Sequence, residues 1–152
     1  MTILRVFGAY LAAVLVLIVL AVITQSLFVL SALTAVGAEI GAGDALAMLG
    51  DDLIGLGPLY GIFIALGLAV ALLAAALVSR LLPVPRGWVF SAAGVVCMLV
   101  MLTLMKEVFF GVQIIAGARS MTGLVVQAVA GGIAGVVFVL LTPQGDLSKS
   151  RT

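Results

Sequence analysis

Residues Val6 to Thr24 read VFGAYLAAVLVLIVLAVIT, an apolar run that decides the fold class of this chain. A helix rises about 1.5 Å per residue, so this run is long enough to cross a hydrocarbon core of about 30 Å. Arg5 precedes the run, as a cation precedes the apolar part of a secretory signal peptide, but that apolar part has only about 7 to 15 residues. We therefore predict an uncleaved membrane anchor. The apolar pattern resumes after Ser26, so in a second interpretation the helix continues to about Thr34.

Three further apolar runs of membrane-spanning length follow along the chain. The first begins at Pro58, because a proline suits the first turn of a helix, where its missing N–H has no intrahelical partner. Pro83 and Pro85 then predict a tight turn, and Trp88 opens the next run as an interfacial aromatic residue. The predicted spans are residues 6–24 or 6–34, 58–79, 88–105 or somewhat longer, and 121–142, with a short cytoplasmic tail at 143–152. We expect an all-α polytopic membrane protein, a single domain over 1–152 with four transmembrane helices in a compact bundle.

The composition excludes several classes of protein. Hydrophobic residues make up 65% of the chain and charged residues 9%, with a mean hydropathy of +1.46, whereas soluble domains average about 25% charged residues. A soluble enzyme is therefore excluded. The net charge of +1 is too small for binding a phosphate backbone, so membrane lipids and not nucleic acid are the expected partners.

The side chains available for chemistry are few. Histidine is absent and Cys97 is the one cysteine, which removes haem, histidine-zinc sites and histidine-based triads. Cys97 lies between Val96 and Met98 and reads as a small packing residue. Charged residues are absent from the middle of the four runs, which argues against an ion-coupled carrier. We expect no cofactor, no metal, no catalytic residue and no enzymatic activity.

Charge asymmetry predicts the orientation of the helices. If four spans alternate, five cations share one side and two the other, and the side with more cations is expected to be cytoplasmic. Five acidic residues fall on the opposite side. Both termini are therefore predicted to lie in the cytoplasm of a cell with a bacterial-type inner membrane. The cations of the first side are Arg5, Arg80, Arg86, Lys149 and Arg151; Lys106 and Arg119 lie opposite, with Glu39, Asp44, Asp51, Asp52 and Glu107.

The two outer connections are unusual. Glycines between Gly37 and Gly57 are expected to break any long helix, leaving two short interfacial turns with Asp44 and Asp51 as N-caps. The second connection, 108–120, is apolar except for Gln113 and Arg119. Re-entrant, interfacial and helix-extending arrangements all fit it; a re-entrant segment would imply a pore or pocket, because backbone at membrane depth needs polar partners.

Small residues follow a helical spacing in the last run. Arg119, Gly123, Gln127, Gly131 and Gly135 recur every four residues and so are expected to share one helical face. Gly131 and Gly135 form a G-x-x-x-G motif. Such faces allow close approach of helix backbones in lipid. The second predicted span carries a similar stripe, Gly67, Ala71 and Ala75. These faces are expected to pack either within one bundle or between protomers.

Polar residues near or inside the spans are the candidate pore or pocket contacts. Gln127 lies inside a predicted span, so its amide group needs a hydrogen-bond partner. Either another helix supplies it, with Thr103 or Ser91 as candidates, or Gln127 lines a pore. The charged residues at the outer boundary either form a mouth or simply mark helix ends. The full candidate set is Arg119, Gln127, Gln113, Lys106, Glu107, Asp51 and Asp52.

These features favour a homo-oligomeric passage or binding cavity for a small solute or lipophilic molecule. An alternative is a non-catalytic subunit or scaffold in a larger membrane complex, docked to another membrane protein through its small-residue helix faces. A lipid-modifying enzyme ranks well below both, because only the outer charged residues suggest a headgroup site.

Overall fold

The computed structural model describes residues 2–108 and 119–142, and the regular structure in these ranges is helical. The helices are α1 (Thr2–Ala35), α2 (Ala42–Leu81), α3 (Arg86–Val108) and α4 (Met121–Leu141). All four are long and apolar enough to cross a membrane. The predicted all-α bundle of four membrane-spanning helices is confirmed.

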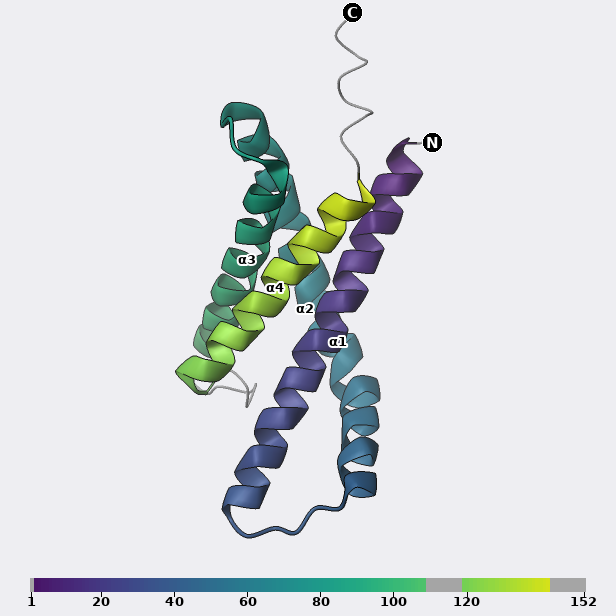
Figure 1. The fold of residues 1–152 in the computed structure, drawn as a ribbon, viewed down its shortest axis with the longest axis vertical. Helices are drawn as coiled ribbons and strands as arrows, with labels where there is room; N and C mark the ends of the chain where they lie inside the picture. Colours follow the sequence, from purple (N-terminus) through teal and green to yellow (C-terminus); the bar gives the residue numbers. More distant parts are fainter. Residues whose placement is uncertain (1, 109–118, 143–152) are drawn as a thin grey trace, which may run out of the picture.

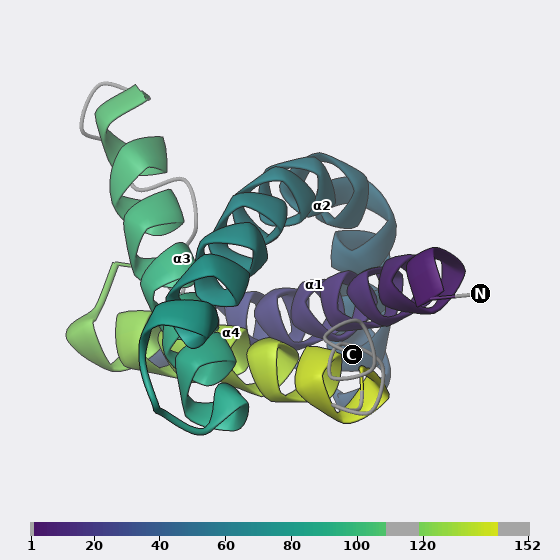
Figure 2. The ribbon, with the colours of Figure 1, turned by 90° about the horizontal axis from the view of Figure 1, so that it is seen from above.

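The helices form a closed antiparallel ring. Each packs against two neighbours, in the pairs α1–α2, α2–α3, α3–α4 and α1–α4. Figure 1 shows that α1 begins and α4 ends at the same end of the bundle, and the view from above in Figure 2 shows α2 curving around α1. The residues at this end of the four helices therefore meet in space, although they are far apart in the sequence.

Two of the helices are longer than a bilayer core. At about 1.5 Å per residue, the 34 residues of α1 and the 40 residues of α2 extend about 51 and 60 Å. The 23 residues of α3 and the 21 residues of α4 extend about 34 and 31 Å, close to a core of about 30 Å. The hairpin of α1 and α2 accordingly projects beyond α3 and α4 (Figure 1). The longer of the two predicted ranges for the first helix is the observed one.

The prediction of short interfacial turns before Pro58 is wrong. Residues from Ala42 onward form one continuous helix with Pro58 in its interior, Gly41 as the N-cap and Asp44 in the first turn. Glycine costs about 1 kcal/mol in an exposed helix, but packing of this segment against α1, including the hydrogen bond from Ser26 to Asp52, stabilises its helical conformation. The interior proline removes one helical hydrogen bond and accounts for the bending of α2, which Figure 2 shows.

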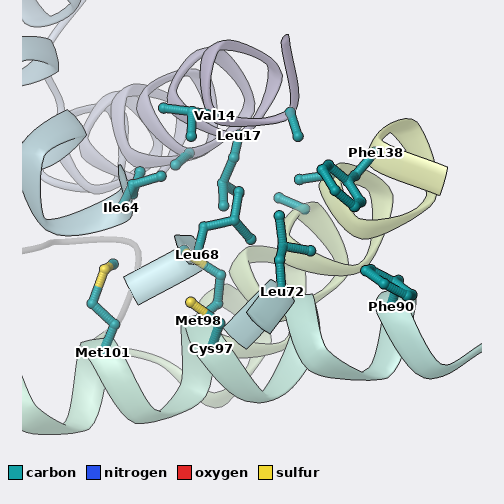
Figure 3. Packing of buried hydrophobic residues seen from close by; sticks show 14 of the residues in the cluster. Val14, Leu17, Ile64, Leu68, Leu72, Phe90, Cys97, Met98, Met101 and Phe138 are labelled. Carbon is teal, nitrogen blue, oxygen red and sulfur yellow. The ribbon is translucent and has the colours of Figure 1, made fainter. Parts of the chain in front are cut away.

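An apolar core fills the space between the helices. Leu17 of α1, Ile64 and Leu68 of α2, and Met98 of α3 are completely buried. Figure 3 shows Leu17 of α1 and Leu68 of α2 reaching toward each other, with Met98 beside them. Phe90 and Phe138 stack with ring centroids 5.4 Å apart, at one end of this core. The core thus holds all four helices in register.

Candidate functional site

Gln127 is the most deeply buried polar side chain of α4, with no exposed surface. Its Nε2 atom donates a hydrogen bond to the backbone carbonyl oxygen of Ala21 in α1, at 3.1 Å. The predicted partners were on α3, and one of them, Thr103, donates instead to the Leu99 carbonyl oxygen of its own helix. The difference arises because α4 packs against α1 as well as α3, and Gln127 faces α1. Among the described residues, the Gln127 Oε1 atom has no hydrogen-bond partner.

A second polar contact joins α1 to α2. Ser26 is completely buried, and its hydroxyl donates to the Asp52 carboxyl oxygen at 2.6 Å. The neighbouring Thr24 and Gln25 are buried as well. These three residues, which interrupt the apolar pattern of the sequence, therefore face the interior of the bundle. Asp52, a candidate residue of the outer end, is thus tied to α1 by a side-chain hydrogen bond.

The other candidate residues of the outer end lie at the surface. Lys106 and Glu107 near the end of α3, and Asp51 in α2, are exposed. Arg119 is exposed too and precedes α4, so it lies outside the helical face on which the sequence spacing placed it. Gln113 lies outside the described residues, as does most of the second outer connection.

The glycines of α4 are buried against α3. A Cβ atom added to Gly131 would overlap the backbone of Gly94, and one added to Gly135 would overlap the backbone of Phe90. Gly123 is also buried, and its N–H donates to Ser120 Oγ at 3.0 Å, which caps the helix. The backbones of α3 and α4 therefore approach one another at positions where only glycine fits.

A cleft of about 650 Å³ lies between α2 and α3. We call it the α2–α3 cleft. The described residues that line it are uncharged, and many of them are small, which leaves room that larger side chains would fill. Gly67 belongs to this lining, and a Cβ atom there would lie 3.2 Å from Cys97 Sγ. The residues that shape the cleft are Gly67, Ala71 and Ala74 of α2 and Ala93, Cys97 and Met101 of α3. Of the predicted stripe on α2, Gly67 and Ala71 line the cleft, whereas Ala75 is buried in the core.

A second cavity, of about 560 Å³, opens at the other end of the bundle, where all four helices contribute residues. We call it the arginine cavity, because Arg86 is the one charged residue among the described residues that line it. Its other main walls are Phe7 and Tyr10 of α1, Leu72 of α2, Phe90 of α3 and Phe138 of α4. Phe90, Leu72 and Phe138 are seen together in Figure 3.

Sequence reasoning missed this second cavity and the Ser26–Asp52 contact. Arg86 follows Pro85 at the start of α3, and in the sequence it indicated only the orientation of the helices. Tyr10 lies inside an apolar run, and no neighbouring residue marked it as part of a cavity. The signal for Ser26 was its place in the polar sequence Thr24-Gln25-Ser26. Nothing in the spacing of residues indicated that Asp52 would be its partner, because this depends on the continuous α2.

Comparison with family models, with curated proteins and with solved structures gives no match for this chain.

Proposed function

We propose that this protein binds a lipophilic molecule inside the membrane, in the α2–α3 cleft. The observation that carries the proposal is a volume of about 650 Å³ with an apolar lining between two membrane-spanning helices. Small-molecule sites have volumes of roughly 300 to 1,000 Å³ and mostly apolar walls. A ligand in this cleft exchanges contacts with lipid tails for contacts with protein, so an uncharged, largely apolar molecule fits it best.

The arrangement of polar groups favours a binding cavity over an aqueous passage. Gln127 has no exposed surface and bonds to the backbone of α1. Asp52 pairs with Ser26 between α1 and α2, away from the cleft lining. A water-filled path through the described part of the chain would require such groups to line a common channel, and these two are divided between different helix pairs.

We further propose that the protein lies in a bacterial-type inner membrane with both termini cytoplasmic. Arg5, Arg80 and Arg86 lie at one end of the bundle, the end where α1 begins and α2 ends. Lys106 and Arg119 lie toward the opposite end. Cytoplasmic flanks of membrane helices carry the excess of cations, which supports this orientation.

Assembly as a homo-oligomer is the remaining part of the proposal. The first turns of α2 lie in the hairpin that projects beyond α3 and α4 (Figure 1). Leu46 in this segment is 70% exposed and Val36 before it is 81% exposed. Exposed apolar side chains outside a lipid core favour an interface, and a neighbouring protomer would cover them.

Photocrosslinking in lipid vesicles tests ligand binding in the cleft. The probe is a palmitic acid that carries a diazirine in its chain, and crosslinked peptides are identified by mass spectrometry. We expect preferential crosslinking to the cleft wall around Cys97 and Met101 over the exposed lipid-facing residue Val129 of α4.

Two variants sharpen this experiment. Ala71→Phe fills the cleft and should remove most of the crosslinking at its wall, whereas Ala92→Phe, on the exposed side of α3, should leave it unchanged. Equal crosslinking along all lipid-facing surfaces, or identical patterns in the two variants, would contradict the proposal.

A second candidate function is docking to another membrane protein through the same cleft. The observation in its favour is the run of small residues, Gly67, Ala71, Ala74 and Ala93, which would allow a partner helix to approach closely. In that case Ala71→Phe should abolish co-purification of a protein partner, and the wild-type cleft should show no preferential lipid crosslinking once that partner is bound.

A further inference from the structure

We propose that the arginine cavity binds an anionic phospholipid of the surrounding leaflet, with an acyl chain between the helices and the phosphate at Arg86. This site is separate from the α2–α3 cleft, and it does not depend on the function proposed for that cleft. Its volume of about 560 Å³ is within the range of small-molecule sites.

The walls of the cavity suit an acyl chain. Phe7, Leu72, Leu73 and Phe138 supply aromatic and aliphatic surface from three helices. Phe7 and Leu73 are exposed, with 55% and 72% of their surface accessible in this chain. The cavity is therefore open on the side where these residues meet the bilayer, and a lipid tail enters it without crossing the core.

The hydroxyl groups of the cavity are already engaged. Tyr10 donates to the Ala65 carbonyl oxygen at 2.7 Å, and Thr142 donates to the Phe138 carbonyl oxygen at 2.6 Å. Neither hydroxyl hydrogen is left for a ligand. Among the described residues of the lining, the guanidinium of Arg86 is the strong donor that remains, so it selects a ligand by negative charge.

The position of Arg86 suits a phosphate. Its guanidinium carbon lies 5.3 Å from the centroid of the Phe90 ring, within the distance of a cation–π contact. A cation–π contact does not use up the N–H donors of a guanidinium group, and these donors bind phosphate oxygens in pairs. Phe90 in turn stacks on Phe138, so the arginine is held at the cavity by the packed end of the core.

The charge distribution of the molecule agrees with an anionic headgroup. Arg5, Arg80 and Arg86 all belong to this end of the bundle, and the acidic residues of the described chain belong to the other end, in 39–52 and at Glu107. Trp88 is 75% exposed, two residues after Arg86, as expected for a side chain at headgroup depth. Basic pockets between membrane helices at this depth are typical sites for anionic lipids.

Native mass spectrometry of the full-length protein tests the proposal. The detergent-solubilised chain is titrated with a phosphatidylglycerol and, in parallel, with a phosphatidylcholine of the same acyl chains. The wild-type protein should bind the phosphatidylglycerol about tenfold more tightly, and added salt should weaken that binding while leaving the phosphatidylcholine unaffected.

Three variants locate the site. Arg86→Gln should raise the dissociation constant for phosphatidylglycerol about tenfold. The matched control Arg80→Gln removes an exposed cation of the same end that does not line the cavity, and should change it less than about twofold. Ala76→Phe fills the cavity and should weaken both lipids. Circular dichroism shows whether each variant is folded, and the salt dependence of the wild-type protein tests the proposal without any substitution.

Three results would overturn the proposal. Equal wild-type affinities for the two lipids would show that charge does not select the ligand. Equal effects of Arg86→Gln and Arg80→Gln would show diffuse attraction to a basic surface. Unchanged phosphatidylglycerol binding in a folded Ala76→Phe protein would show that the lipid lies elsewhere.

Discussion

At the scale of single residues, the buried polar side chains fix how the helices pair. Gln127 ties α4 to α1 and Ser26 ties α1 to α2, whereas Tyr10 ties α1 to α2 nearer the other end. Hydrogen bonds between membrane helices contribute only about 0.6 kcal/mol on average. Their role is therefore to fix the relative position of neighbouring helices, whose apolar surfaces alone would pack in several registers.

Replacing Gln127 by leucine should change the free energy of unfolding by less than about 1 kcal/mol. The substitution removes one interhelical hydrogen bond, but it also removes the Oε1 atom that is buried without a partner among the described residues. Unfolding in a series of detergent mixtures measures the difference. A loss of several kcal/mol would mean that Gln127 makes a further essential contact.

The Ser26–Asp52 contact should behave as a coupled pair. Ser26→Ala should destabilise the protein by about 1 kcal/mol, because the hydrogen bond at 2.6 Å is lost inside the bundle. Asp52→Ala should cost about the same, and the double variant should cost less than the sum of the two. Additive effects in this double-mutant cycle would indicate that the two residues act independently.

At the scale of the helices, α3 and α4 depend on backbone contact through glycine. Gly94 and Gly131 approach so closely that neither position has room for a Cβ atom. By contrast, a Cβ atom at Gly8 of α1 or at Gly55 of α2 would meet nothing within 4 Å. The same residue type thus has opposite roles in different helices.

Alanine substitutions separate these two roles. Gly131→Ala should destabilise the protein by about 1 to 3 kcal/mol, because α3 and α4 must move apart. Gly55→Ala should instead be neutral or stabilise α2 by up to about 1 kcal/mol, since it improves helix propensity in open space. The helical circular dichroism signal during detergent unfolding measures both. A Gly131→Ala protein as stable as the wild type would contradict the close contact.

The helices show where sequence patterns are sufficient and where they are not. Apolar length predicts all four spans, and the predicted boundaries of the last one differ from Met121–Leu141 by a single residue. The prediction for α2 was wrong, because it assigned to the glycines between 41 and 57 the full helix-breaking effect that they have in an exposed helix. In the structure, contact with the neighbouring α1 keeps that segment helical.

At the scale of the whole molecule, the candidate sites arise from the order of the helices around the ring. The α2–α3 cleft and the arginine cavity are both formed by residues from helices that meet only after folding. Apolar periodicity shows that a helix has an inward face, but not which helix that face will meet. In the sequence, Phe90 was therefore an ordinary residue of a span and Arg86 indicated only orientation, and Gln127 was assigned partners on the wrong helix.

Orientation is a property of the whole molecule that labelling tests. In a Cys97→Ala background, Val36→Cys in the connection between α1 and α2 should react with a membrane-impermeant maleimide applied to intact cells from outside. Val84→Cys, in the turn between α2 and α3, should react only after permeabilisation. The reverse pattern would place both termini outside the cytoplasm.

The central claim is that this bundle assembles with copies of itself and holds a lipophilic ligand. Native mass spectrometry of the full-length protein released from nanodiscs tests it most directly, since one spectrum reports stoichiometry and bound mass together. We expect a discrete homo-oligomer with a defined adduct that Ala71→Phe removes and Ala92→Phe retains. A bare monomer, or an adduct unaffected by Ala71→Phe, would contradict the account.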